Sequence, residues 1–426
     1  MHQQQFSVFW IINITLFIIL DTYVIYNWQK YVRRRKHSPW LYKPLWIVAA
    51  IMISVFAFVR LSSFEANNPI TSHNIMIVLY IWYLPKLIIS IVLLFKDITR
   101  LIIFCIKLII EFYDKRISKK HSRVSHSGSG NDTPDSVIVP RRDFLQKAAW
   151  MTAGAPFIIA GNGMFRTAFD FQTYEHFLPI SGLPPEFEGL RIVQISDIHS
   201  GSFSSSKPMR EVRLIIESLR PDIILITGDY VNFNANELSI TFPELKKLSA
   251  PLGVYGSIGN HDHYMSQEDH ETLKNGIRDA GINLLVNSNS VIRVDGSELN
   301  LAAIDNSGLG QNFGRINEAM SGLNTANPTI LMAHDPTFWD KQVRGKMPAI
   351  DVMLSGHTHG GQVGIHILGE DYSFARMVYK QWAGMYTDKD QILYVNRGMG
   401  MVGPPLRLAI EPEITVFTLT RPENKG

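Results

Sequence analysis

The sequence predicts a helical membrane region followed by an α/β domain. Apolar residues are concentrated in the first third of the 426-residue chain, in three runs each long enough to cross a bilayer as a helix. From about residue 188 onward, short β-branched runs alternate with amphipathic stretches, which is typical of α/β domains. Several of these short runs end in His, Asp or Asn, so the predicted domain carries chemically competent groups at its strand ends.

Residues 1–113 form the predicted membrane region, with transmembrane helices at about 6–26, 45–61 and 74–95. Lys86 lies near the middle of the third helix, where a lone charge costs about 2.5 to 3.5 kcal/mol on insertion scales. Asp21 in the first helix is a candidate partner. The alternative is that Asp21 sits at the membrane interface and that Lys86 marks nothing functional.

The charges of the loops predict how the chain threads the membrane. The loop 27–44 holds six basic residues and no acid, whereas the loop 62–73 holds Glu65 and no base. By the positive-inside rule the first loop is cytoplasmic and the N-terminus lies outside. In the stretch that follows the third helix, charged residues recur along one helical stripe, which predicts an interfacial amphipathic helix at about 98–113 on the inner membrane surface.

Residues 114–140 are basic and then rich in Ser, Gly and Asp, and we expect a flexible cytoplasmic linker there. Residues 141–168 resemble a twin-arginine signal, with Arg141 and Arg142 followed by Phe144, Leu145 and an apolar run. This resemblance implies export of the following domain by the twin-arginine translocase of a bacterium. No clean cleavage site follows, so we expect a retained anchor and a multi-pass protein of the inner, or cytoplasmic, membrane. The alternative is an ordinary apolar helix flanked by two arginines.

Composition excludes several functions. Cys105 is the only cysteine, so the chain cannot form an intrachain disulfide, and thiols cannot supply a metal site elsewhere. The net charge of +3 is small, and the basic residues bunch in membrane-proximal loops. We therefore expect no nucleic-acid partner.

Five predicted strands of the α/β domain end in metal-competent side chains. Because strand ends of an open α/β sheet gather on one rim, we expect these groups to lie together. Gly228, Gly259 and Gly356 stand beside them and let the backbone turn close to a bound group. The five runs are RIVQISDIHSG with Asp197 and His199, DIILITGDY with Asp229, GVYGSIGNHDH with Asn260, His261 and Asp262, TILMAHDP with His334, and DVMLSGHTHGG with His357 and His359.

This ordered set of motifs resembles the calcineurin-like metallophosphoesterase superfamily over residues 188–420. The resemblance implies a four-layer α-β-β-α sandwich, in which two packed sheets are flanked by helices. Within the superfamily, the segments GNHDHY, GHTHGGQ and YVNRGMGMVGPP are similar to a membrane-linked bacterial branch. That branch includes exported phosphodiesterases and a lipid A precursor pyrophosphatase.

The resemblance also implies a ligand set for two divalent metal ions. Asp197, His199 and His359 would hold the first ion, Asn260, His334 and His357 the second, and Asp229 would bridge them. A nitrogen and oxygen set without sulfur suits Mn, Fe, Zn or Co. A hydroxide bridging the two ions would be the nucleophile of an in-line displacement.

Further residues are candidates for catalysis and substrate binding. By the same resemblance, His261 would steady the transition state or protonate the leaving oxygen, and Asp262 would orient it; alternatively, His261 is a packing residue. Arg397 and Arg407 could grip a phosphate or a carboxylate, although a structural ion pair is an alternative for both. Asn306 is a third candidate contact, and we expect His263, His270 and His366 to be solvated or packed.

The sequence thus predicts a membrane-anchored, dinuclear metal-dependent phosphoesterase that hydrolyses a phosphodiester or pyrophosphate bond. A lipid or envelope glycolipid would suit such an enzyme, and so would a phosphorylated small molecule. One alternative is a non-catalytic metal-binding or sensing module. Another is a cytoplasm-facing hydrolase of a nucleotide-linked precursor.

Overall fold

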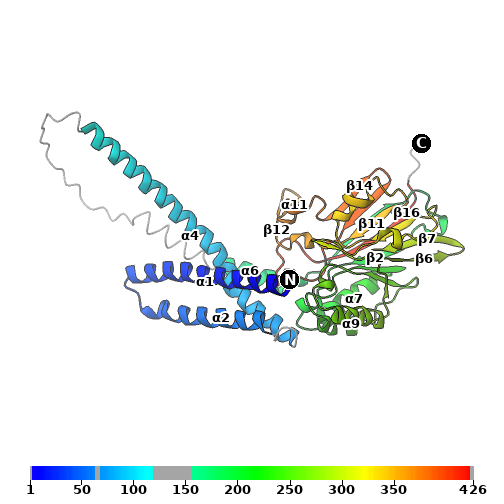
Figure 1. The fold of residues 1–426 in the computed structure, drawn as a ribbon, viewed down its shortest axis with the longest axis horizontal. Helices are drawn as coiled ribbons and strands as arrows, with labels where there is room; N and C mark the ends of the chain where they lie inside the picture. Colours follow the sequence, from blue (N-terminus) through cyan, green and yellow to red (C-terminus); the bar gives the residue numbers. More distant parts are fainter. Residues whose placement is uncertain (1, 63–67, 119–154, 423–426) are drawn as a thin grey trace. The chain divides into compact units, whose positions relative to one another are not determined.

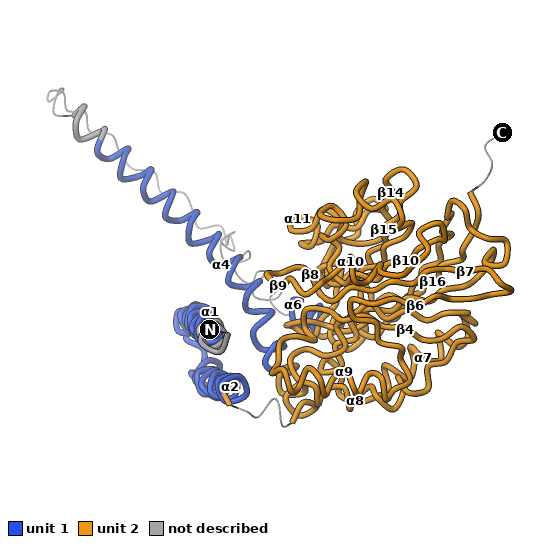
Figure 2. Tube along the Cα trace, turned by 45° about the vertical axis from the view of Figure 1, so that its right-hand side comes forward, with its two compact units in different colours: residues 1–61, 79–160 blue, residues 62–78, 161–426 orange. Residues whose placement is uncertain are grey.

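The structure is a computed structural model that describes residues 2–62, 68–118 and 155–422. The chain divides into two compact units, coloured separately in Figure 2. The first comprises residues 1–61 and 79–160, and the second comprises residues 62–78 and 161–426. Each unit has its own packing.

The first unit consists of long apolar helices. They are α1 (His2–Arg34), α2 (Lys43–Leu61) and most of α4 (Pro69–Ser118). Among the described residues, three helical segments are long and apolar enough to cross a membrane: Trp10–Arg34, Pro39–Leu61 and Pro69–Phe112. Each overlaps one of the three predicted transmembrane segments.

Helix α4 departs from the expected organisation. Its 50 residues run without interruption through both the predicted third transmembrane helix and the predicted interfacial helix. Pro85 lies inside the helix and does not end it, although proline removes one main-chain hydrogen bond. The charged residues that recur at helical spacing therefore belong to the same helix as the third transmembrane segment and do not mark a separate helix. The predicted linker beyond residue 118 and the signal-like motif at Arg141 and Arg142 lie outside the described residues.

The predicted partnership of Lys86 and Asp21 is confirmed. Lys86 Nζ donates to Asp21 Oδ1, and both side chains are buried. The ammonium also lies 3.3 Å from the centroid of the Trp82 ring. Pairing of this kind offsets the cost of placing a charge among apolar helices.

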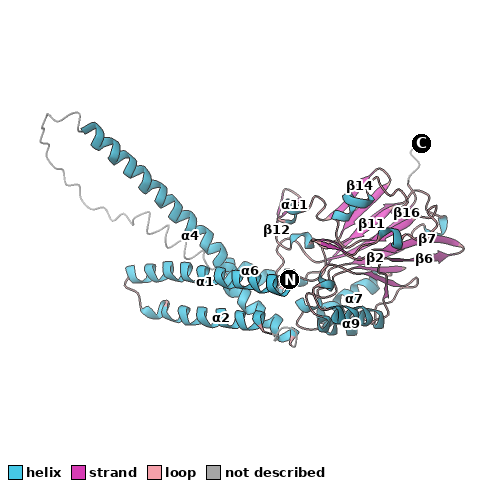
Figure 3. Cartoon of the chain, viewed as in Figure 1, coloured by secondary structure: helices cyan, strands magenta, loops and turns pink. Residues whose placement is uncertain are grey.

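The second unit is built on two six-stranded sheets (Figure 3). The first sheet has the order β1-β16-β2-β3-β4-β5, and the second has the order β14-β15-β11-β10-β7-β6. The first sheet has four neighbouring parallel strands, β2, β3, β4 and β5. The second sheet also has four neighbouring parallel strands, β7, β10, β11 and β15. The strands of the first sheet are β1 (Gln172–Pro179), β2 (Arg191–Ile195), β3 (Ile223–Thr227), β4 (Val254–Ser257), β5 (Asn283–Leu284) and β16 (Glu413–Thr420). Those of the second are β6 (Ser288–Val294), β7 (Ser297–Ala303), β10 (Thr329–Met332), β11 (Val352–Ser355), β14 (Gly384–Asp388) and β15 (Gln391–Val395).

Three apolar cores separate four layers, as predicted. A central core between the sheets includes Leu225 and Leu354, both fully buried. An outer core joins the first sheet to helices α7 (Lys207–Leu219), α8 (Leu238–Leu245) and α9 (Gln267–Asp279). The opposite outer core joins the second sheet to α10 (Ile316–Ala319) and the short helix η8 (Trp339–Val343). The order is helices, sheet, sheet, helices.

The α/β domain begins earlier than the predicted residue 188. Strand β1 pairs in parallel with β16 along its whole length and so belongs to the first sheet. It is an edge strand with only Leu178 buried, so its residues lack the apolar run that marks the central strands. The short helix α6 (Ala155–Phe165) precedes it. Two small hairpins complete the unit: β8 (Ser307–Gly308) with β9 (Gln311–Asn312), and β12 (Gly364–Ile367) with β13 (Glu370–Ser373), which is followed by α11 (Ala375–Val378).

Candidate metal centre

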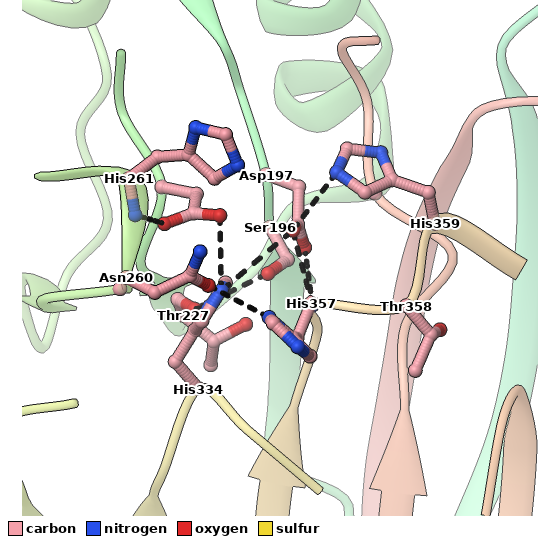
Figure 4. A network of polar contacts seen from close by, with 12 residues as sticks. Ser196, Asp197, Thr227, Asn260, His261, His334, His357, Thr358 and His359 are labelled. Atoms are coloured by element: carbon pink, nitrogen blue, oxygen red, sulfur yellow. Dashed lines mark hydrogen bonds and ion pairs between the residues drawn. The ribbon is translucent and has the colours of Figure 1, made fainter. Parts of the chain in front are cut away.

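Five strands from both sheets deliver their polar C-terminal residues to one place, as Figure 4 shows. Strands β2, β3 and β4 belong to the first sheet, and β10 and β11 belong to the second. Because the two sheets pack face to face, the rim of one meets the rim of the other. The seven predicted ligand residues are Asp197, His199, Asp229, Asn260, His334, His357 and His359, and these strand ends carry all of them.

One group of side chains contains Asp197, His199 and His359, whose ligand atoms all lie within 4.8 Å of one another. The Nε2 atoms of the two histidines are 3.1 Å apart, and His359 Nε2 is 3.3 Å from Asp197 Oδ1. All three residues are buried. These are the residues predicted for the first metal ion.

A second group contains Asp229, His334 and His357. His334 Nε2 lies 3.1 Å from Asp229 Oδ2, and His357 Nδ1 lies 2.7 Å from Asn260 Oδ1. Asp229 Oδ2 is also 3.5 Å from His199 Nε2, which belongs to the first group. Asp229 therefore stands between the two groups, at the position predicted for a bridging ligand.

The residues fit divalent cations. The Nε2 atoms of His199 and His359 are 3.1 Å apart. One shared cation, at the usual distance of about 2.0–2.1 Å from each nitrogen, would bind both lone pairs. The donors are imidazole nitrogens, carboxylates and one amide oxygen, which suit first-row transition metals. The chemistry of the set agrees with the predicted Mn, Fe, Zn or Co without choosing among them.

The backbone at these positions is strained. Non-glycine residues rarely adopt a positive φ, and each such residue costs about 1 to 3 kcal/mol. Five of the seven ligand residues do so: Asp197 (φ 50°), His199 (44°), Asp229 (56°), His357 (75°) and His359 (51°). Strain concentrated at one cluster marks a site that the rest of the fold holds in place.

Two of the predicted glycines make room for the ligands. A Cβ at Gly259 would lie 2.2 Å from Asp229 Oδ1, and a Cβ at Gly356 would lie 2.2 Å from Asp197 Oδ2. Any larger residue would displace a carboxylate of the site. The close approach confirms that these positions need glycine.

Electrostatics favour an ionised Asp229. Burial would raise the pKa of Asp229, but the neighbouring His334 and His261 hold it well below its usual value. Burial would lower the pKa of His334, yet the charges of Asp229 and Asp197 raise it to about 10. Burial lowers the pKa of His359 well below its usual value, which favours the neutral imidazole that binds metals.

His261 lies beside the ligand groups but is held differently from our expectation. Its ring is within 4.8 Å of the ligand atoms of His199 and Asp229, and burial lowers its pKa to about 4. Its Nδ1 lies 2.8 Å from the Asn232 carbonyl, not from Asp262. Donation from Nδ1 to that carbonyl leaves Nε2 without a proton in the neutral ring.

The side chain of Asp262 binds main-chain N–H groups. Its carboxylate accepts main-chain N–H bonds from Gly259, Asp229 and Tyr230, at 3.0, 2.9 and 2.8 Å. The side chain therefore ties the loop after β3 to the loop after β4. The expected contact with the His261 ring does not occur, because both carboxylate oxygens already accept from the backbone.

The predicted substrate contacts lie in different surroundings. Arg407 is fully buried, and its guanidinium donates to the carbonyls of Arg397, Gly398, Gly400, Ile410 and Glu411. Arg397 donates to the Tyr174 hydroxyl at 2.7 Å and to Asp371 at 3.0 Å. Asn306 is buried and donates to Gln311 Oε1 at 2.8 Å. Arg397 thus forms an ion pair, which was the structural alternative to substrate binding. Arg407 instead acts as a clamp that holds main-chain carbonyls together.

The three histidines that we expected to be solvated or packed do not belong to the ligand groups. His263 Nε2 lies 2.6 Å from Asp305, His270 is buried with Nδ1 2.7 Å from the Asp262 carbonyl, and exposed His366 pairs with Asp371.

Tyr379 is a site residue that sequence reasoning missed. Its hydroxyl lies 2.9 Å from His357 Nε2, 22 positions earlier in the chain. No strand end or motif marks this tyrosine, so only the folded chain brings it to the histidine.

Comparison with known sequences agrees with this geometry. Residues 190–361 match the family described as calcineurin-like phosphoesterase, and residues 5–168 match the family described as probable calcineurin-like phosphoesterase, transmembrane domain. The uncharacterized metallophosphoesterase YkuE of Bacillus subtilis is 32% identical over 290 residues, which cover 66% of this chain and 97% of that protein. This chain is a calcineurin-like metallophosphoesterase.

Other metallophosphoesterases are similar at comparable levels. The zebrafish (Danio rerio) transmembrane protein with metallophosphoesterase domain is 31% identical over 62% of this chain, which spans 60% of that protein. The phosphodiesterase YaeI of Escherichia coli is 29% identical over 54% of this chain and 82% of that protein. The family is one of metal-dependent hydrolases of phosphoric esters, and the apolar helices make this member a membrane protein.

Proposed function

We propose that this metallophosphoesterase hydrolyses a phosphodiester or pyrophosphate bond with two divalent metal ions. The observation that carries the proposal is the meeting of two ligand groups on either side of Asp229. Ions bound there would supply positive charge for the phosphoryl oxygens and lower the pKa of the attacking water. The chain itself supplies the ligands and their rigid placement.

The protein's own residues would do the positioning. Asp197, His199 and His359 would hold one ion, Asn260, His334 and His357 the other, and Asp229 would contact both. Main-chain N–H groups orient the carboxylates, since His261 N donates to Asp229 Oδ1 at 2.8 Å and His357 N donates to Asp197 at 3.0 Å. Fixed ligands of this kind avoid reorganisation during the reaction.

His261 would act on the substrate. Its Nδ1 is engaged by the Asn232 carbonyl, so Nε2 is the ring atom available to a phosphoryl or leaving oxygen. Nε2 would first have to take up a proton, for example from the attacking water, and the resulting imidazolium would then steady charge in the transition state or pass that proton to the leaving oxygen. Asn232 takes the orienting role that we had expected of Asp262.

Hydrolysis of bis-p-nitrophenyl phosphate tests the proposal. The full-length chain in detergent is stripped of metal, resupplied with Mn, Zn or Fe, and compared with Asp229→Asn. Asp279→Asn, at the exposed end of α9, is the matched control. Activity that returns with metal in the wild type and the control but not in Asp229→Asn supports the proposal. No activity with any metal, despite two bound ions per chain, would favour the non-catalytic binding module.

We also propose that the catalytic domain lies outside the cytoplasm of a bacterium, exported by the twin-arginine translocase. The basic loop 27–44 supports a cytoplasmic first loop, and the matching family is named for four transmembrane segments. The three membrane-long helices together with the signal-like segment 141–168 would make four, which returns the chain to the side of the N-terminus. An active C-terminal alkaline phosphatase fusion supports this topology, because that reporter folds only outside the cytoplasm. An inactive fusion beside a fluorescent C-terminal green fluorescent protein would support the cytoplasm-facing hydrolase.

A membrane-held active site suits a substrate that lies in the same membrane. We propose a lipid or envelope glycolipid as the substrate class, since tethering confines the enzyme's search to the surface. Turnover of soluble diesters with none of a lipid-bearing diester in mixed micelles would contradict this assignment and leave the phosphoesterase activity intact.

A further inference from the structure

A small segment of the catalytic unit exposes an unusual amount of apolar surface. It comprises β12, β13 and α11, residues 364–378, and we call it the apolar hairpin; Figure 1 labels β12 and α11 side by side. At its turn, Leu368 is 99% exposed, and in α11 Met377 is 82% exposed. Its exposed apolar side chains are Ile365, Ile367, Leu368, Tyr372, Phe374, Met377 and Val378. An apolar cluster of this kind marks an interaction surface.

One face of the hairpin carries Ile365, Ile367 and Tyr372, with Glu370 beside them at the turn. Ile365 pairs with Tyr372, and the next pair along the ladder, His366 with Asp371, points to the opposite face. Asp371 accepts a hydrogen bond from Arg397 of the body of the domain at 3.0 Å, so this face is attached to the protein at Asp371, while His366 stays exposed. The Ile365 and Tyr372 face is then turned outward.

The base of the hairpin is attached to the metal centre. Only residues 360–363 separate His359 from the start of β12 at Gly364. Ser373 Oγ donates to the Gly360 carbonyl at 2.5 Å, and Tyr379, just beyond α11, contacts His357. Whatever the hairpin binds is therefore held next to the ligand residues.

An apolar helix reaches the domain at the same place. The segment Leu406–Leu408 lies between them, because Arg407 N donates to the Gly163 carbonyl of α6 at 3.2 Å while Gly364 N of β12 donates to the Leu408 carbonyl at 2.9 Å. Phe165, the last residue of α6, is 61% exposed. The hairpin and the end of an apolar helix thus flank one short segment.

We propose that the apolar hairpin inserts into the surface of the lipid bilayer that carries the chain. The bilayer is the favoured occupant because the described part of the chain has three helices long and apolar enough to span one, and because the exposed side chains lie at and near the hairpin turn, as in interfacial anchors. Arg376, 5.3 Å from the centroid of the Tyr372 ring, places a cation beside the apolar tip where lipid phosphates lie. Insertion would turn the metal centre toward lipid head groups; only this last consequence rests on the proposed function.

Site-specific fluorescence in the full-length protein tests the insertion. Cys105 is the sole cysteine, so Cys105→Ser provides a thiol-free background. A single cysteine is placed at Leu368, at Met377 or at the control Leu214, which is 49% exposed on α7. Each is labelled with an environment-sensitive nitrobenzoxadiazole dye and reconstituted in phosphatidylcholine and phosphatidylglycerol vesicles, with and without doxyl-labelled lipid.

We expect a blue-shifted emission that doxyl lipid quenches at positions 368 and 377, and an unshifted, unquenched emission at 214. A blue shift without lipid quenching would show burial against a second copy or a protein partner and would overturn the proposal. Water-like emission at all three positions would overturn it as well, and so would equal quenching at all three. None of these readouts uses activity, so a failure of the hairpin proposal is distinguishable from a failure of the proposed hydrolase.

Discussion

Replacing Gly259 by alanine adds one methyl group at the most crowded point of the metal centre. The new Cβ would lie 2.2 Å from Asp229 Oδ1 and 2.7 Å from the Asp229 main-chain nitrogen. Contacts below 3.0 Å essentially never occur for a real Cβ. The Asp229 carboxylate must therefore move by about 0.8 Å, and a misplacement near 1 Å costs roughly 10²-fold in rate.

The assay is turnover of bis-p-nitrophenyl phosphate by the metal-loaded, full-length protein, with metal content measured by mass spectrometry. Gly161→Ala is the matched control, because a Cβ there meets nothing within 4 Å and alanine favours the helix. We expect Gly259→Ala to lose about 10²-fold in kcat/KM, with a lower metal content, and Gly161→Ala to behave as the wild type.

Retention of both metals and of near wild-type turnover in Gly259→Ala would refute the reasoning. It would mean that the loop after β4 relaxes without moving Asp229, so that the carboxylate does not depend on the glycine. Equal losses in both variants would point to general damage from adding a methyl group.

Four further substitutions and one double variant probe other parts of the structure. His261→Ala should keep both metal ions and lose about 10²- to 10⁴-fold in kcat, the range for a lost acid or base; loss of metal would instead make His261 a ligand. Arg407→Met removes a buried guanidinium that burial leaves with a pKa of about 10, still protonated at neutral pH, and strands five carbonyls. Its free energy of unfolding should fall by about 3 kcal/mol or more, seen as a lower Tm in detergent, and an unchanged Tm would contradict the clamp. Asp21→Asn and Lys86→Met should each lower the heat stability of the solubilised protein, and the double variant should lose less than the two losses added together; additive losses would argue against a direct pair.

Features that depend on short-range interactions could be predicted from the sequence, whereas features that depend on contacts between distant segments could not. The apolar runs and the strand ends could be predicted because each depends on a few neighbouring residues, and the resemblance to a family added the seven candidate ligand residues. Strand β1 escaped prediction because an edge strand lacks an apolar run. Helix α4 was divided in two because its charged stripe resembles the start of an interfacial helix, although the backbone pattern continues.

The roles of individual side chains depended on contacts between distant segments. Asp262 follows His261 directly in sequence, yet its carboxylate binds the backbone of residues 229 and 230 while the Asn232 carbonyl takes the histidine. The charge of Arg407 predicted a ligand contact equally well, and only its complete burial shows that it holds a loop.

The sequence by itself determined the two-part architecture and the strands whose ends carry the candidate ligand residues. Tertiary structure decided which of these residues meet, as with His199 and His359, whose nitrogens lie 3.1 Å apart across 160 positions of sequence. It also decided which backbone positions are strained and which apolar side chains of the hairpin stay exposed. The physical reason is that periodicity and turn preferences act over a few residues, whereas side-chain partners and burial arise only when two sheets pack together.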